Sequence, residues 1–178
     1  MSNMKKGKTR TLALWIAAIV ASLGLLLYLF SQHVGGVNQV KGRSMEPSLK
    51  ENMFIYVSKL ENDKMNVKQG DIIIYRISEN NPADFVSRVV AVGGDTVIIG
   101  QGKVTVNGKD FIVSTVPTAV TANFEDGFTK EGVPMTVPSN SIFVLGDNRM
   151  RSADSRDFGF IKKERIKGVF QFCYSNCQ

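Results

Sequence analysis

The sequence predicts an all-β domain of antiparallel strands, preceded by one N-terminal transmembrane helix. Three observations lead to this prediction. Residues 11–30 contain no charged side chain. From Val37 onward, short apolar runs alternate with a period of two residues, which is the period of a strand with one buried face. Glycine and asparagine turns separate these runs at regular intervals, as in sheets built from hairpins.

The first expected element is the membrane helix over residues 11–30. About 20 apolar residues in a helix match a hydrocarbon core roughly 30 Å thick. The segment that follows, Ser31-Gln32-His33-Val34, lacks the small residues of a signal-peptide cleavage site, so we expect an uncleaved anchor. Basic flanks remain in the cytoplasm, and residues 1–10 contain four basic side chains. We therefore expect residues 31–178 to lie outside the cytoplasmic membrane of the cell.

The expected strands cover seven short runs: residues 53–57, 71–77, 85–92, 96–99, 103–107, 111–115 and 141–145. Gly93-Gly94-Asp95 predicts a sharp turn between two of them, and Asn107-Gly108 is typical of a two-residue hairpin. Residues 100–138 are less patterned and carry three of the five prolines, so we expect them to form an insertion in one domain.

The net charge of +6 could indicate nucleic-acid binding, but the basic residues outside the N-terminal flank are dispersed. Without a basic stripe interleaved with aromatics, we expect no nucleic-acid partner, and instead a mildly basic surface facing membrane lipid. Cys173 and Cys177 have no histidine nearby that could complete a zinc site, so they form either a disulfide or two free thiols. We expect no metal and no other cofactor.

Ser44, in residues 42–48 (GRSMEPS), is the candidate nucleophile. A serine hydroxyl needs a neighbouring base to accept its proton. His33 is the one histidine of the chain, lies eleven residues earlier beside the expected membrane helix, and no Gly-x-Ser-x-Gly motif is present. We therefore do not expect a Ser-His-Asp triad. A lysine whose pKa falls on desolvation is the other base that such a serine could use.

Four stretches resemble, in order, the signature sequences of type I signal peptidases: residues 44–48 (SMEPS), 70–75 (GDIIIY), 88–97 (RVVAVGGDTV) and 146–159 (GDNRMRSADSRDFG). The resemblance spans most of the chain beyond the expected anchor. It implies a β fold of the signal peptidase type. It also implies a membrane-bound serine endopeptidase with a Ser-Lys dyad and no cofactor. Such an enzyme removes signal peptides from exported preproteins at the outer face of the membrane.

The resemblance also assigns roles to residues. Ser44 would be the nucleophile, and its backbone N–H would contribute to the oxyanion hole. Some family members carry a further hydroxyl two residues before this serine, where the present chain has Gly42. Asp147, Ser152 and Arg156 match residues that support the dyad. We expect Asp147 and Arg156 to form a charge pair and the Ser152 hydroxyl to orient the base.

The chain departs from the family pattern at the general base, because Ser87 occupies the position of the dyad lysine. Loss of a positioned general base costs about 10²–10⁴-fold in rate. Three explanations are open. Another base could act, and the candidates are a water held by Ser87 and Ser152 or one of three lysines, Lys41, Lys59 and Lys103. The enzyme could be slow. Finally, the chain could have lost activity and use its groove as a binding or assembly factor for secreted or surface proteins.

Substrate binding by this family resembles the addition of a β-strand to a sheet. We expect the signal peptide to lie between residues 39–43 and residues 84–87. A third hypothesis, a soluble self-cleaving regulator with a Ser-Lys dyad and a related β fold, is disfavoured by the expected membrane helix and by the lack of a DNA-binding segment.

Overall fold

The structure is a computed structural model that describes residues 14–28, 35–59, 66–114, 116 and 127–177. The chain divides into two units, Met1–Val34 and Gly35–Gln178, and each is described separately below.

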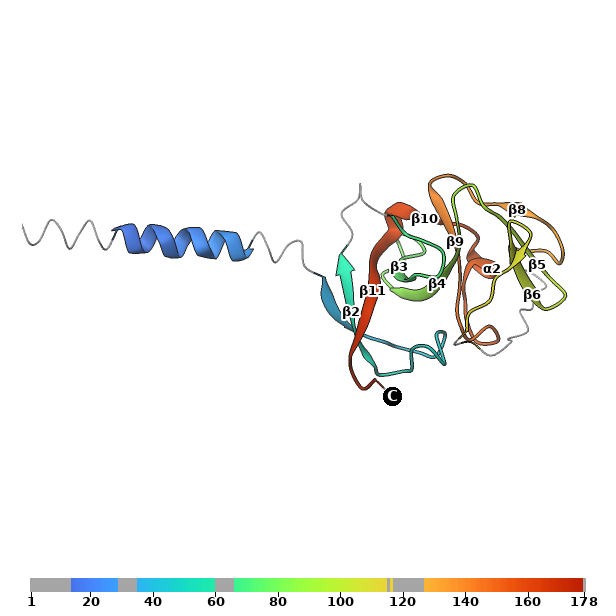
Figure 1. The fold of residues 1–178 in the computed structure, drawn as a ribbon, viewed down its shortest axis with the longest axis horizontal. Coiled ribbons are helices and arrows are strands. Elements are labelled where there is room, and N and C mark those ends of the chain that lie inside the picture. The colour runs from blue at the N-terminus through green and yellow to red at the C-terminus, as the bar shows by residue number, and fades with distance from the viewer. Residues whose placement is uncertain (1–13, 29–34, 60–65, 115, 117–126, 178) are drawn as a thin grey trace, which may run out of the picture. The chain divides into compact units, whose positions relative to one another are not determined.

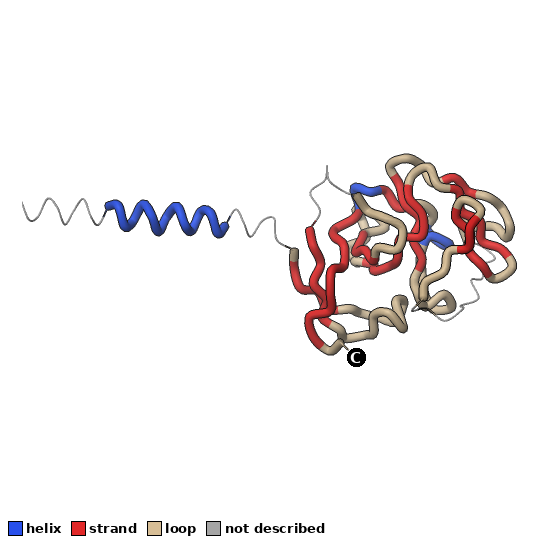
Figure 2. The backbone as a smooth tube through the Cα atoms, viewed as in Figure 1, coloured by secondary structure: helices blue, strands red, loops and turns tan. Residues whose placement is uncertain are grey.

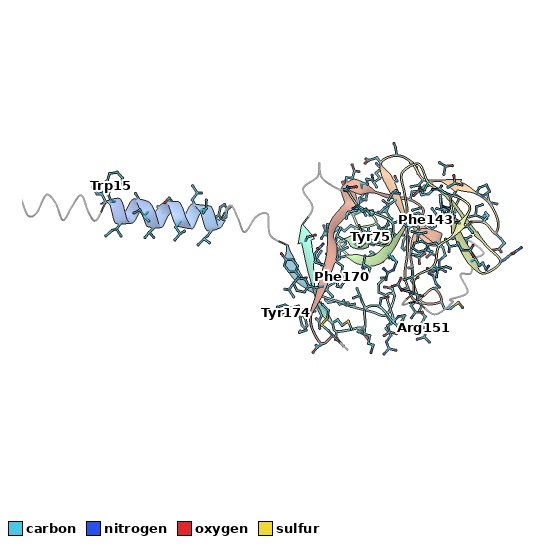
Figure 3. All side chains as sticks on the ribbon, in the orientation of Figure 1. Trp15, Tyr75, Phe143, Arg151, Phe170 and Tyr174 are labelled. Atoms are coloured by element: carbon cyan, nitrogen blue, oxygen red, sulfur yellow. A yellow bond between two sulfur atoms is a disulfide. The ribbon has the colours of Figure 1, made fainter. Side chains whose placement is uncertain are left out.

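In the first unit, residues 14–28 form a helix whose large apolar side chains are exposed. Trp15, for example, is 71% exposed and projects from the helix surface (Figure 3). Within the described part of the chain, no helix has both the length and the apolar character needed to cross a membrane. Residues 11–13 and 29–30 of the expected membrane helix, the basic flank over residues 1–10 and His33 lie outside the described residues.

The second unit is built mainly of strands, with one short α-helix and one 3-10 helix among its described residues. In chain order the elements are β1 (Gly36–Gln39), β2 (Phe54–Lys59), β3 (Ile72–Tyr75), β4 (Phe85–Val92), β5 (Thr96–Gly100), β6 (Lys103–Val106), β7 (Lys109–Asp110), β8 (Met135–Thr136), β9 (Ser141–Leu145), α2 (Ser155–Phe158), β10 (Ile161–Lys162), η1 (Lys163–Arg165) and β11 (Ile166–Ser175).

Seven strands form one antiparallel sheet in the order β1-β2-β11-β3-β4-β9-β10. The sheet must curl, because β10 and β11 are four strands apart in this order, or about 19 Å in a flat sheet. The chain between Lys162 and Ile166, which joins these strands, can span at most about 14 Å. Figure 1 shows β3 and β4 lying between β11 and β9, with β10 bringing the far edge back towards β11.

A second, four-stranded antiparallel sheet has the order β7-β6-β5-β8. Its strands are grouped at one side of the unit (Figure 2). Asn107 and Gly108, with φ of 52° and 76°, form the tight turn between β6 and β7. This is the backbone conformation that a two-residue hairpin with Asn-Gly requires. Three of the four strands of this second sheet, β6, β7 and β8, lie within residues 100–138.

Three clusters of buried apolar side chains hold the sheets. One fills the inside of the curled sheet, and Tyr75 lies in it (Figure 3). A second lies on the other face and includes Met45 and Leu49 from the loop that contains Ser44. The third joins the two sheets through β4, β5, β6 and β9. Every residue of β9 is buried, and its four apolar residues alternate between clusters: Ile142 and Val144 enter the first, while Phe143 and Leu145 enter the third.

The structure confirms six of the seven expected strands, with β4 and β9 at the bounds predicted. The strand expected over residues 111–115 is wrong in its described part, residues 111–114. The hairpin turn pairs Val106 with Lys109 and Thr105 with Asp110, so the strand lies two residues earlier, in β7. The structure also shows that Cys173 and Cys177 form a disulfide.

Candidate active site

Ser44 lies half-buried in the loop between β1 and β2. Two backbone hydrogen bonds close the base of this loop, from Val40 N to Met53 O (2.8 Å) and from Asn52 N to Val40 O (2.9 Å). Met45 directly after the serine is 1% exposed and packs in the cluster on β2 and β3. Burial of such a side chain contributes about 1.5–3 kcal/mol, so Met45 anchors the loop against the sheet.

The segment after β9 clamps the Ser44 loop from the opposite side. Asn148 donates its backbone N–H to Ser44 O (2.9 Å) and its side-chain amide to Arg43 O (3.1 Å). The approach requires glycine at position 146, since a Cβ there would lie 2.6 Å from Ser44 O and 2.3 Å from Ser152 Cβ. The sequence stretches around residues 44 and 146 therefore meet in space although a hundred residues separate them.

Arg88 on β4 links its own sequence stretch to the other three. Its guanidinium donates two hydrogen bonds to the carboxylate of Asp147 (2.6 and 2.8 Å). It also donates to the backbone oxygen of Gly70 (2.9 Å) and to the hydroxyl of Ser48 (3.2 Å). The Asp147 side chain is 1% exposed and that of Arg88 is 12% exposed. A bidentate pair of this kind fixes both distance and orientation, so Arg88 sets the position of the loop that begins at Asp147.

A second buried pair joins Arg156 to Asp154, with Nε–Oδ1 and Nη2–Oδ2 distances of 2.9 Å. Ser152 donates its hydroxyl to Asp154 Oδ2 (2.5 Å) and accepts a hydrogen bond from Arg156 Nη2 (2.9 Å). The Asp154 carboxylate also accepts from Gly146 N (3.0 Å). The Ser152 hydroxyl proton is therefore directed at Asp154, and its oxygen at Arg156.

The predicted Asp147–Arg156 pair is wrong in its partners. Asp147 pairs with Arg88, and Arg156 pairs with Asp154. Asp154 caps the N-terminus of α2, where it accepts from Arg156 N, and this places its carboxylate beside the Arg156 side chain two residues later. Asp147 follows β9 by two residues, and the β9 strand ends opposite Arg88 on β4, so the Asp147 carboxylate lies near Arg88. All four charged residues lie in two of the sequence stretches, 88–97 and 146–159. Their spacing along the chain does not show which arginine meets which aspartate.

Ser87, for which the sequence resemblance predicts the position of the dyad lysine, is 1% exposed on β4. Its hydroxyl lies 3.2 Å from the hydroxyl of Tyr75 on the neighbouring strand β3. Burial raises the pKa of Tyr75 well above its ordinary value, the hydrogen bond with Ser87 opposes this rise, and the charges of Asp154 and Asp157 add to it. Two neutral hydroxyls thus occupy this place, and neither accepts a proton near neutral pH.

The three lysines considered as substitute bases lie in different places. Lys41 lines the same groove as Ser44. Lys103 is on β6 in the second sheet, where it lies 3.4 Å from Asp110. Lys59 ends β2, and its side chain lies outside the described residues. Of the two side chains that can be placed, only that of Lys41 shares a cavity with Ser44.

A groove of about 980 Å³ passes Ser44. One wall consists of residues 37–39 and 41–44, including Gly42, and the other of residues 82–86. These are the two sides that the sequence predicted for substrate binding, except that Ser87 is buried beside Tyr75. Asp84 stands in the second wall. Burial would raise the pKa of its carboxyl, but hydrogen bonds from Lys167 (2.9 Å) and Arg76 (3.0 Å) outweigh this and lower it.

Comparison with known proteins gives a consistent result. The family model described as signal peptidase, peptidase S26, matches residues 11–175. A signal peptidase I from Bacillus caldolyticus is 34% identical over 166 residues, which cover 90% of this chain and 87% of that protein. A signal peptidase I from Bacillus licheniformis is 32% identical over 176 residues, covering 94% and 90% respectively. A solved signal peptidase I from Enterococcus faecalis V583 is 29% identical and aligns with a TM-score of 0.48, covering 60% of this chain and 97% of that one.

Proposed function

Because the chain belongs to the signal peptidase family, peptidase S26, we propose that it is a serine endopeptidase of the signal peptidase I type. In this proposal it removes signal peptides from exported preproteins, with Ser44 as the nucleophile. The observation that carries the proposal is the fixed position of Ser44 at an open groove. Ser44 is held on one side by the buried neighbour Met45 and on the other by the hydrogen bonds of Asn148 to Ser44 O and Arg43 O.

The substrate segment lies as an added strand between residues 37–43 and 82–86. Ser44 Oγ attacks the scissile carbonyl carbon and forms an ester, and the amine of the mature protein leaves after it gains a proton. Water then hydrolyses the ester and releases the signal peptide as a carboxylate. The Ser44 backbone N–H donates to the oxyanion that forms at the attacked carbonyl. Gly42 supplies no hydroxyl to this site.

The proton of Ser44 passes to water in the open groove, since Ser87 and Tyr75 cannot accept it. We therefore propose a slow enzyme, whose rate is about 10²–10⁴-fold below that of the same scaffold with a lysine base. Asp147, Ser152 and Arg156 support the site indirectly. Asp147 acts through Arg88, and the other two through the network around Asp154.

We further propose that residues 11–30 anchor the chain in the membrane, with residues 1–10 cytoplasmic and residues 31–178 outside. The uncharged run of residues 11–30, the exposed apolar side chains of the helix over residues 14–28 and the Cys173–Cys177 disulfide support this topology. A shared membrane also raises the effective concentration of the preprotein near Ser44.

The test is cleavage of a signal-peptide-bearing preprotein by the full-length protein in lipid. We expect slow cleavage by the parent, none by Ser44→Ala, and an increase of about 10²–10⁴-fold in Ser87→Lys. The control Ser139→Ala removes the hydroxyl of an exposed turn residue and should leave the rate unchanged. Circular dichroism of each variant checks that it folds.

Two outcomes would reject the proposal. If the parent cuts no faster than Ser44→Ala while Ser87→Lys cuts, the scaffold is competent but the natural chain is a peptide-binding member of the family. If Ser44→Ala retains the parental rate, another residue is the nucleophile.

A further inference from the structure

Three cations line the groove together with Ser44: Lys41, Arg43 and Arg151. All three are exposed. Lys41 and Arg43 precede the serine in the first wall. Arg151 comes from the segment that packs on Ser44 through Gly146 and Asn148, and its side chain projects from the edge of the unit (Figure 3). Two separate parts of the chain therefore bring positive charge to the place where a scissile bond would lie.

Among the described residues, some charged side chains of the groove form ion pairs and others do not. Asp84 is the one acid among the lining residues, and it pairs with Arg76 (3.0 Å) and Lys167 (2.7 Å). Arg43 lies 3.8 Å from Glu46 and 3.5 Å from Glu51. For Lys41 and Arg151, by contrast, the described residues provide no ion-pair partner within 4.0 Å. Among the described residues, the groove that Ser44 lines thus has two positive charges without an ion-pair partner.

We infer that the groove selects peptide segments that carry an acidic side chain within about two residues of the scissile bond, a distance that lysine and arginine side chains can reach along an extended strand. Lys41 and Arg151 are the residues that determine this specificity. The inference rests on the proposed function, because it names the substrate class of that site. Exposed ion pairs are individually weak, so the two cations together should favour an acidic peptide by about three- to tenfold in Kd.

Binding is measured with the full-length protein in detergent, in a Ser44→Ala background that prevents turnover. The probes are fluorescent peptides that span a preprotein cleavage site, made in pairs with Glu or Gln at each of the two positions on either side of the bond. We expect one or more Glu peptides to bind about three- to tenfold more tightly than their Gln partners, with a smaller ratio at high salt. Lys41→Gln/Arg151→Gln should bring the ratio to about one by weakening the Glu peptide alone.

The matched control is Lys109→Gln, which removes an exposed lysine of β7 in the second sheet and should leave the ratio unchanged. The inference is overturned if the Glu/Gln ratio is near one in the parent, or if the ratio is unchanged in the double variant. In either case, peptide binding itself would still support the proposed function. If no peptide of either kind binds, the proposed function fails as well. The Lys41→Gln/Arg151→Gln protein could instead bind vesicles containing phosphatidylglycerol less well while its Glu/Gln peptide ratio stays that of the parent. That result would place the two cations at the membrane surface and also overturn the inference.

Discussion

Arg88 and Arg156 show how single buried residues shape this site. Each is bidentate to a buried aspartate. Arg88 also donates to Gly70 and Ser48 in distant parts of the chain, and Arg156 also donates to Ser152 within its own loop. A buried ion pair gains little net stability over apolar residues of the same size, because desolvation offsets the attraction. Removing one partner is costly, however, since the other charge is left buried. The pairs therefore act mainly to fix the loop over residues 146–156 in one arrangement.

We expect Arg88→Gln to lower the free energy of unfolding by about 3–5 kcal/mol, because Asp147 is then buried without its partner. Urea unfolding followed by circular dichroism measures the change. The matched control is Arg76→Gln, which breaks an arginine–aspartate pair whose side chains are 41% and 42% exposed, and should cost less than about 1 kcal/mol. Arg88→Gln/Asp147→Asn should recover part of the loss. Equal costs for the two single substitutions would contradict the structural role given to Arg88.

Ser87 illustrates a different effect of one residue. Its side chain is short enough to lie beside Tyr75 in the interior, so the pair satisfies its hydrogen bonding without a charge. A lysine at this position would bring an ammonium group next to apolar side chains, and its pKa would fall on desolvation. In the proposed enzyme, Ser87→Lys would therefore place a base of lowered pKa where the chain now holds two hydroxyls.

At the scale of elements, β11 connects the two halves of the large sheet. It pairs with β2 on one side and with β3 on the other, and it breaks the ladder with bulges near Gly168, Phe170 and Cys173. Phe172 stacks on Tyr56 of β2 with ring centroids 5.1 Å apart. Since β2 and β3 each adjoin a stretch of the site, β11 holds the Ser44 loop and the Ser87 strand in a common frame.

The position of Gly168 makes β11 sensitive to a single methyl group. A Cβ at this position would lie 2.3 Å from Ser58 O and 2.5 Å from Val57 Cγ1 on β2. We expect Gly168→Ala to lower the free energy of unfolding by about 1–3 kcal/mol, because backbone must shift to admit it. Gly36→Ala in β1, where a Cβ would meet nothing within 4 Å, is the control and should change stability by less than about 0.5 kcal/mol. Thermal unfolding that gave the same midpoint for both would show that the β2–β11 contact is looser than described.

At the scale of the whole molecule, the described core, sheets and candidate site all belong to one of the two units, Gly35–Gln178. The three buried clusters and both sheets draw all their residues from Gly35–Gln178. The groove and the network around Asp147 and Asp154 lie there as well. A core that is complete within one unit allows that unit to fold without the other.

We therefore expect a fragment of residues 35–178 to unfold cooperatively, with the far-ultraviolet circular dichroism of a β protein. The full-length chain, with the proposed anchor, should remain with lipid vesicles in flotation, while the fragment should be recovered largely in the aqueous fraction. A fragment without a cooperative transition would show that the N-terminal unit contributes to the core. Equal flotation of both proteins would contradict the assignment of residues 11–30 as the anchor.

Local patterns in the sequence already determined much of this protein. The alternation of apolar residues located β4 and β9 to the residue, and Asn107-Gly108 located the hairpin of the second sheet. The order of four motifs identified the family and singled out Ser44. These features depend on a few neighbouring residues, which is why a single sequence is enough to find them. The central strand β11 escaped prediction because Gly168 and its bulges interrupt the period of two.

Tertiary structure alone decided which groups meet. The pairing of Arg88 with Asp147, the clamp of Asn148 on Ser44 and the contact of Ser87 with Tyr75 each join different segments of the chain. Periodicity and motif spacing describe neighbours along the chain, and they carry no information on which carboxylate a distant arginine will face. That choice follows from the register of β4 with β9 and β3, which the packing of all three clusters determines together.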